Sequence, residues 1–216
     1  MQYNPLIHHR RSIRLKGYDY SQADSYFITI CCQDRKCRFG KITVVGASLA
    51  DAQNAQMELN EYGMIAYNEW MKLPQRFPIF ELDVFQIMPN HMHGIITLVR
   101  TSLTDAHDIV QPHNENRAGV NHAPTIGDIV GAYKSLVANA CLEIYKSKNA
   151  VETGFTPVPV MRAGVNPTPT TTPMMGKLWQ RNYYEHITRN EQSYQNISNY
   201  IISNPAKWNE DKFYSI

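Results

Sequence analysis

The stretch that decides the fold is residues 82–99, LDVFQIMPNHMHGIITLV, in which Pro89 and Asn90 join two apolar runs. Each run has the length and the β-branched and aromatic content of a strand, and a Pro-Asn pair between strands is typical of a tight reversal. The stretch therefore predicts a β-hairpin.

Two histidines, His91 and His93, come directly after this turn. Side chains alternate between the two faces of a strand, so both imidazoles are expected on one face and Met92 on the other. At this spacing two imidazoles can bind one cation while the Met92 face packs into a core. The chain has eight histidines among 216 residues, so a chance His-x-His pair is the competing interpretation.

The composition is that of an ordinary globular protein. Hydrophobic residues make up 43% of the chain and charged residues 19%, and no run approaches the roughly 18 apolar residues of a membrane span. The start of the chain lacks the apolar core of a signal peptide. We expect a single domain over residues 1–216, in the cytoplasm and with no membrane partner. The four cysteines form no C-x-x-C pair and are expected to be reduced.

The net charge of +2 is too mild to indicate a nucleic-acid partner by itself. Its distribution is more informative, because Arg10, Arg11 and Arg14 lie together in a basic arm over residues 1–24. Such an arm suits contact with backbone phosphates, and a solvated tail is the alternative.

The remaining hydrophobic patterns predict strands and helices in mixed order. Strands are expected at residues 26–32, 41–45 and 178–183, and helices at residues 58–73, 126–146 and 188–205. With the hairpin, this is the order of a ferredoxin-like (split βαβ) fold with an extra hairpin strand and a C-terminal helix. We therefore predict an α+β fold with an antiparallel sheet flanked by helices. Residues 101–124 and 148–176 are predicted to be flexible loops.

The last predicted helix carries a second group of polar residues. Tyr194, Ile197 and Ile201 share one stripe, which is predicted to face the core. Tyr200 is displaced from that stripe, and Asn204 presents an amide oxygen one turn later. An oxygen ligand beside two imidazoles suits Mg²⁺ or Mn²⁺. In a chain with 13 tyrosines, an ordinary surface tyrosine is the alternative for Tyr200.

Three segments taken together, PNHMHGII, WQRNYYEHITRN and NYIISNP, resemble those of one known family. The combination is similar to that of the HUH-type single-tyrosine transposases, and most closely to the REP-associated tyrosine transposases of bacteria. The resemblance extends to HHRRSIRLKGYDY near the N-terminus and to GDIVGAYKS, so it covers nearly the whole chain outside the predicted loops.

The resemblance implies a DNA-nicking and strand-transfer activity on single-stranded or hairpin DNA, through a 5′-phosphotyrosine link. It implies that Tyr200 is the nucleophile and that His91 and His93 hold Mg²⁺ or Mn²⁺. Asn204 would stand at the position where a glutamine completes the metal site in the insertion-sequence relatives. The asparagine side chain is one methylene shorter than that of glutamine, so the identity of the third metal ligand stays open. Relatives of this kind act as monomers or homodimers.

Further residues are candidates for contact with DNA. They are the phosphate-contact candidates Arg10, Arg11, Arg14, Lys134 and Arg181, and His186, which also matches the family pattern. Trp179, Tyr183 and Tyr184 could stack on bases or belong to the core.

Two other functions stay open from the sequence. The first is a non-catalytic protein that binds single-stranded nucleic acid through the same ferredoxin-like sheet. The second is a metal-dependent hydrolase that uses an activated water and keeps Tyr200 as a structural residue.

Overall fold

The computed structural model describes residues 25–44, 55–99, 124–153 and 175–214. The predicted basic arm, with Arg10, Arg11 and Arg14, lies outside these residues. So does most of both predicted loops.

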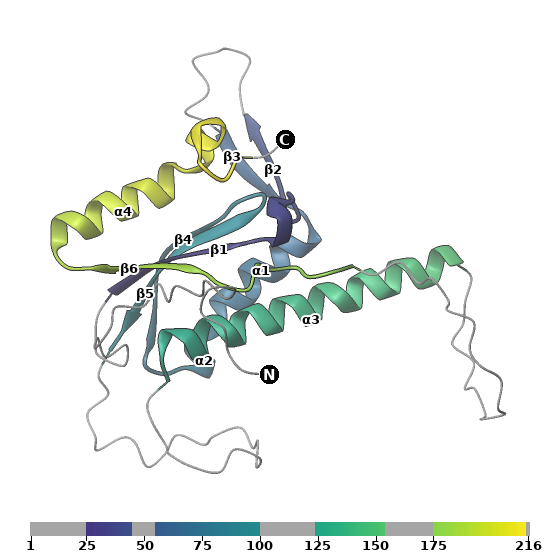
Figure 1. The fold of residues 1–216 in the computed structure, drawn as a ribbon, viewed down its shortest axis with the longest axis horizontal. Helices are drawn as coiled ribbons and strands as arrows, with labels where there is room; N and C mark the ends of the chain where they lie inside the picture. The colour runs from purple at the N-terminus through teal and green to yellow at the C-terminus, as the bar shows by residue number, and fades with distance from the viewer. Residues whose placement is uncertain (1–24, 45–54, 100–123, 154–174, 215–216) are drawn as a thin grey trace, which may run out of the picture.

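A four-stranded antiparallel sheet in the order β4-β5-β1-β6 forms the centre of the fold (Figure 1). Its strands are β1 (Ser25–Cys31), β4 (Phe80–Ile87), β5 (His91–Leu98) and β6 (Tyr184–Thr188). The hairpin predicted from residues 82–99 is the β4–β5 pair, so this prediction is confirmed.

Helices cover both faces of this sheet. They are α1 (Glu61–Met71), the short α2 (Leu73–Arg76), α3 (Ile126–Thr153) and α4 (Glu191–Ser203). Helix α1 lies between β1 and β4 in the chain and α3 between β5 and β6, which is the split βαβ connectivity. Helix α4 lies across the sheet from α3 (Figure 1). The predicted α+β fold with an antiparallel sheet flanked by helices is confirmed.

The two faces of β5 differ as the alternation predicts. Met92 and Ile96 belong to the hydrophobic core, together with Trp70 of α1 and Tyr133 of α3. Gly94 lies on the same face, and a Cβ there would come within 2.8 Å of Trp70 Cζ2. Glycine at this position therefore lets the indole lie directly on the strand.

The predicted extra strand belongs to a separate two-stranded sheet. It is β2 (Gly40–Val44), which pairs with β3 (Ala55–Leu59). The sequence placed residues 58 and 59 in a helix, which is wrong, because Asn60 caps α1 by accepting a hydrogen bond from the Gly63 N–H. The helix therefore begins at Glu61.

The last strand of the sheet also differs from the prediction. Residues 178–183 make only one isolated bridge, between Cys32 and Trp179, and the strand itself is β6. The Lys134 ammonium donates to three successive carbonyls in this stretch, those of Gln180, Arg181 and Asn182. These contacts hold the segment in an irregular path before the strand begins.

Both later helices have bounds that differ from those predicted. Helix α3 continues to Thr153, beyond residue 146 and into the predicted loop. Helix α4 begins after Asn190, whose side chain accepts a hydrogen bond from Ser193 N at 2.8 Å, rather than at Thr188. A short 3₁₀ helix, η3 (Pro205–Glu210), follows α4 directly.

Within the described residues, no helix has both the length and the apolar content that a membrane crossing requires.

Candidate metal centre

The two histidines of β5 lie buried on the sheet face opposite the core. His91 and His93 are almost inaccessible to solvent, and their Nε2 atoms are 3.0 Å apart. Strand alternation brings the two rings to one side, as the sequence predicted. The Nε2 atoms of the two rings are therefore directed toward the same point.

Neighbouring side chains hold both rings by the other nitrogen, Nδ1. The Asn90 amide nitrogen donates to two carbonyls, of Arg35 at 3.0 Å and of Phe213 at 2.7 Å, so its oxygen faces His91 Nδ1 at 2.8 Å. That oxygen can only accept, so Nδ1 of His91 carries the proton and Nε2 offers a lone pair. His93 Nδ1 is 2.8 Å from the Thr29 hydroxyl. Such partners on the second ring nitrogen are typical of metal-binding histidines.

Burial also keeps both imidazoles neutral. It lowers the pKa of His91 to about 4 and the pKa of His93 well below its usual range. Neutral imidazole is the form that binds a metal ion. At neutral pH, therefore, no proton has to leave either ring before a cation can bind.

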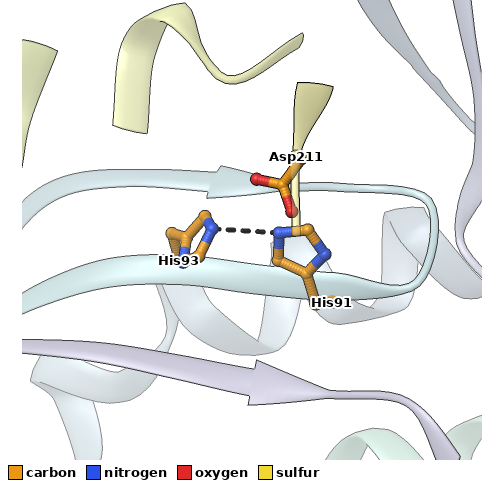
Figure 2. Close-up of side chains that lie close together, drawn as sticks. All are labelled: His91, His93 and Asp211. Atoms are coloured by element: carbon orange, nitrogen blue, oxygen red, sulfur yellow. Dashed lines mark hydrogen bonds between the residues drawn. The ribbon is translucent and has the colours of Figure 1, made fainter. Parts of the chain in front are cut away.

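Asp211 completes a group that could hold a metal ion, because one carboxylate oxygen and one nitrogen of each histidine lie within 4.8 Å of one another. In Figure 2 the carboxylate approaches the two rings from the C-terminal segment, which passes over the sheet. Two neutral imidazoles and one carboxylate suit a divalent cation. Asp211 lies beyond the last predicted helix and outside any periodic pattern, so no local sequence signal marks it as a ligand.

The C-terminal segment that carries Asp211 is fixed to the two turns beside the histidines. Asp211 Oδ1 accepts a hydrogen bond from Phe213 N at 2.6 Å, and the Phe213 carbonyl accepts from Asn90. The Arg35 guanidinium donates to the Lys212 carbonyl at 3.1 Å. Asp211 is therefore positioned by contacts that are distant in sequence.

Tyr200 faces this group from α4. Its hydroxyl is 3.2 Å from His93 Nε2 and donates to Asp211 Oδ2 at 3.1 Å. The side chain is 38% exposed, so the hydroxyl lies between the buried centre and solvent. Burial and the nearby charge of Asp211 raise the pKa of Tyr200. The phenol is consequently protonated at neutral pH.

Asn204 lies beside the same carboxylate. Its amide nitrogen donates to Asp211 Oδ2 at 2.9 Å, while its side-chain oxygen is buried with no hydrogen-bond partner. Buried polar atoms are rarely left unpaired. An oxygen with this placement fits a cation site, so Asn204 as a ligand stays a prediction alongside Asp211.

Aromatic rings and cations surround the centre. The rings of Phe213 and Trp208 lie 4.7 and 6.0 Å from that of His91. Arg35 and Lys212 lie over the Phe213 ring at 5.4 and 4.8 Å. Arg35 also has a positive φ of 53°, a conformation that costs a non-glycine residue energy and recurs at functional sites.

The predicted DNA-contact residues lie in different settings. Arg181 is exposed, and so is His186, which pairs in register with Phe27 on β1. The contacts of Lys134 with three carbonyls already engage its ammonium, and its role in DNA contact stays a prediction. Trp179 is buried in the core, whereas Tyr184 is 50% exposed near Phe213.

Fold and site together define a ferredoxin-like α+β protein in which two buried histidines of the sheet and the partly buried Asp211 form a group fit for a divalent cation. The chain is 36% identical to an uncharacterized protein of Haemophilus influenzae over 213 residues, which cover 99% of this chain and 97% of the relative. The chain therefore belongs to the same protein family as this relative. No family model matches the chain.

Two solved structures show more distant likeness. One is a REP-associated tyrosine transposase bound to a REP hairpin, with 17% identity and a TM-score of 0.45, covering 90% of this chain and 73% of that one. The other is a transposase candidate from Deinococcus radiodurans, with 16% identity and a TM-score of 0.35, covering 88% of this chain and 95% of that one. Both scores lie below 0.5, so any function assigned to the chain depends on the geometry of its own site.

Proposed function

We propose that this protein is an HUH-type tyrosine transposase of the REP-associated kind, a metal-dependent enzyme that nicks and rejoins single-stranded DNA at hairpins. One observation carries the proposal: the Tyr200 hydroxyl lies within hydrogen-bonding distance of both His93 Nε2 and Asp211. A phenol on a terminal helix, facing two neutral imidazoles and a carboxylate, is the constellation that phosphotyrosine chemistry needs.

In the proposed reaction, Tyr200 Oη attacks a DNA phosphorus and the bond from that phosphorus to the 3′ oxygen breaks. The leaving 3′ oxygen takes up one proton, which balances the proton that Tyr200 loses. The products are a 5′-phosphotyrosine link and a strand with a 3′ hydroxyl, and the reverse reaction rejoins strands. A divalent cation, Mg²⁺ or Mn²⁺, would polarise the phosphate and stabilise the charge that develops there. His91, His93 and Asp211 would hold it, and the unpaired amide oxygen of Asn204 is proposed as a further ligand.

The chain supplies the groups that handle the nucleophile. Because burial raises the pKa of Tyr200, its proton must leave as the phenol attacks. Asp211 Oδ2, 3.1 Å away, is the carboxylate oxygen within reach of that proton. Thr29 and Asn90 hold the two imidazoles in place and keep their Nε2 atoms turned toward the site.

The surroundings favour an anionic polymer as substrate. Arg35 and Lys212 bring two positive charges to the rim of the site through their contacts with Phe213. The exposed Tyr184 lies 5.8 Å from the Lys212 ammonium and offers a surface for stacking. Arg10, Arg11, Arg14, Lys134, Arg181 and His186 belong to the proposal as further DNA contacts.

The deciding experiment is to trap the covalent intermediate. Purified protein is incubated with labelled hairpin DNA that has single-stranded flanks, with Mn²⁺ or Mg²⁺, and resolved on a denaturing gel. We expect a protein–DNA adduct that Tyr200→Phe and His91→Ala abolish and that Tyr67→Phe, a change at an exposed tyrosine on α1, leaves intact.

The alternatives predict different results. DNA binding without cleavage by the parent protein would favour a non-catalytic binding protein. Cleavage that persists in Tyr200→Phe with no adduct would favour a hydrolase that uses water.

A further inference from the structure

A hollow of about 370 Å³ lies between the β2–β3 sheet and the C-terminal segment. Its walls come from the β2–β3 hairpin, from Pro89 in the β4–β5 turn, and from the C-terminal segment with Trp208 and Tyr214. The volume lies at the lower end of the range of about 300–1,000 Å³ that is usual for small-ligand sites. All of the residues that form it are distinct from the histidines, Asp211 and Tyr200.

The lining combines aromatic walls with few polar groups. Trp208 and Tyr214 meet edge to face with their ring centroids 5.3 Å apart, and Ile42 and Val44 add apolar surface. The polar lining includes the Asn209 amide, which can pair with the edge of a base. An aromatic cleft with a few placed polar groups fits a flat heterocycle such as a nucleobase.

Charge at the rim fits the rest of a nucleotide. Lys41 lines the hollow and forms an ion pair with Glu58 at 3.4 Å, in which both side chains are well exposed. An exposed ion pair of this kind contributes little to stability, so a phosphate can compete for the ammonium.

The position of the hollow links it to the proposed chemistry. Trp208 forms a wall of the hollow, and its ring centroid is 6.0 Å from that of His91. Pro89 lies two residues before His91 in the same turn. Trp208 therefore belongs both to the wall of the hollow and to the surroundings of His91.

We infer that this hollow binds one unpaired nucleobase next to the phosphodiester that Tyr200 attacks. The inference rests on the proposed function and adds to it a specificity site for the single-stranded flank. The base stacks in the hollow on the exposed ring of Tyr214, the buried ring of Trp208 forms the wall beside it, and Lys41 contacts its phosphate.

Cys37 provides a direct readout of occupancy. It lines the hollow and is exposed, whereas Cys31, Cys32 and Cys141 are buried. A neutral alkylating reagent should therefore modify Cys37 first, and an abasic strand controls for the effect of the phosphate charge on the thiol. The Tyr200→Phe protein is used so that no DNA is cleaved during the measurement.

Two probes are compared at equal occupancy, measured by fluorescence anisotropy: a short single strand of mixed sequence and an abasic strand of the same length. We expect the base-bearing strand to slow alkylation of Cys37 more than the abasic strand does. In Tyr214→Ala the concentration that gives half protection should rise about 5- to 100-fold, the usual effect of losing one stacking partner.

Tyr67→Ala is the matched control, because Tyr67 is 39% exposed and Tyr214 is 40% exposed, and Tyr67 lies on α1. Equal protection by the two strands, no protection by either, or equal behaviour of the two variants would overturn the inference. If protection follows the expected pattern but no adduct ever forms, the base site stands and the transposase proposal fails. If an adduct forms without protection of Cys37, the base site fails and the transposase proposal stands.

Discussion

Replacement of Asp211 by asparagine tests the third position of the metal centre. The carboxylate accepts hydrogen bonds from the Tyr200 hydroxyl, from Asn204 Nδ2 and from Phe213 N. Asparagine has nearly the same shape but has one acceptor oxygen and no charge. Its NH₂ group would therefore face at least one of these three donors.

Two magnitudes follow from these contacts. Leaving a buried donor unpaired costs about 1–3 kcal/mol of unfolding free energy, which corresponds to a fall in Tm of roughly 2–10 °C for a chain of this size. Changes to residues that only hydrogen-bond to a metal ligand typically weaken metal binding about 10- to 100-fold, or about 1.4–2.7 kcal/mol. Asp211 is the only carboxylate in the group, so its loss should weaken Mn²⁺ binding by at least that much.

The assay is isothermal titration of metal-free protein with Mn²⁺, together with thermal unfolding. Glu210→Gln is the matched control, because Glu210 is an exposed acid in the adjacent position and is outside the group. Mn²⁺ affinity that is the same in Asp211→Asn and in the parent protein would refute the assignment of Asp211 to the metal centre.

Three further outcomes follow from the structure. The pKa of His91 is about 4 in the folded protein and about 6.5 in the unfolded chain, so the unfolded chain binds a proton first as the pH falls. Metal-free protein should therefore lose up to about 3 kcal/mol of unfolding free energy between pH 6.5 and pH 4, measured by urea unfolding. The substitution His91→Gln should flatten this pH dependence. Gly94→Ala should lower unfolding free energy by about 1–3 kcal/mol in the same assay, because the new Cβ meets Trp70. The double change Arg35→Gln and Lys212→Gln should reduce the slope of log K against log salt for single-stranded DNA by about 1.4, and an unchanged slope would exclude both residues from phosphate contact.

The sequence predicted the features that depend on local pattern. The β4–β5 hairpin and the shared face of His91 and His93 follow from strand alternation, which a short window of residues records. Helical spacing places Tyr200 off the core-facing stripe of its helix, whereas its position opposite the histidines was implied only by the resemblance to the tyrosine transposases. The ferredoxin-like order follows from counting such windows.

The features that the sequence missed depend on contacts between distant segments. Strand β3 was missed because it is defined by its pairing with β2, in which Gly40 lies opposite Leu59. The position of β6 depends on Lys134, which binds the backbone more than forty residues later. Asp211 reaches the histidines only because Asn90 and Arg35 hold the C-terminal segment in place. No window of adjacent residues contains these interactions.

The alternation along β5 separates two kinds of mutational effect within one short strand. Changes at Met92 and Ile96 remove packing against α1 and α3, so a saturation scan should find them through reduced protein abundance. Changes at His91 and His93 alter the opposite face, and the same scan should find them through lost activity in protein that still accumulates. The difference between the abundance score and the activity score should then alternate from one residue to the next along β5. The positions where only activity is lost would mark the face of the sheet that carries the chemistry.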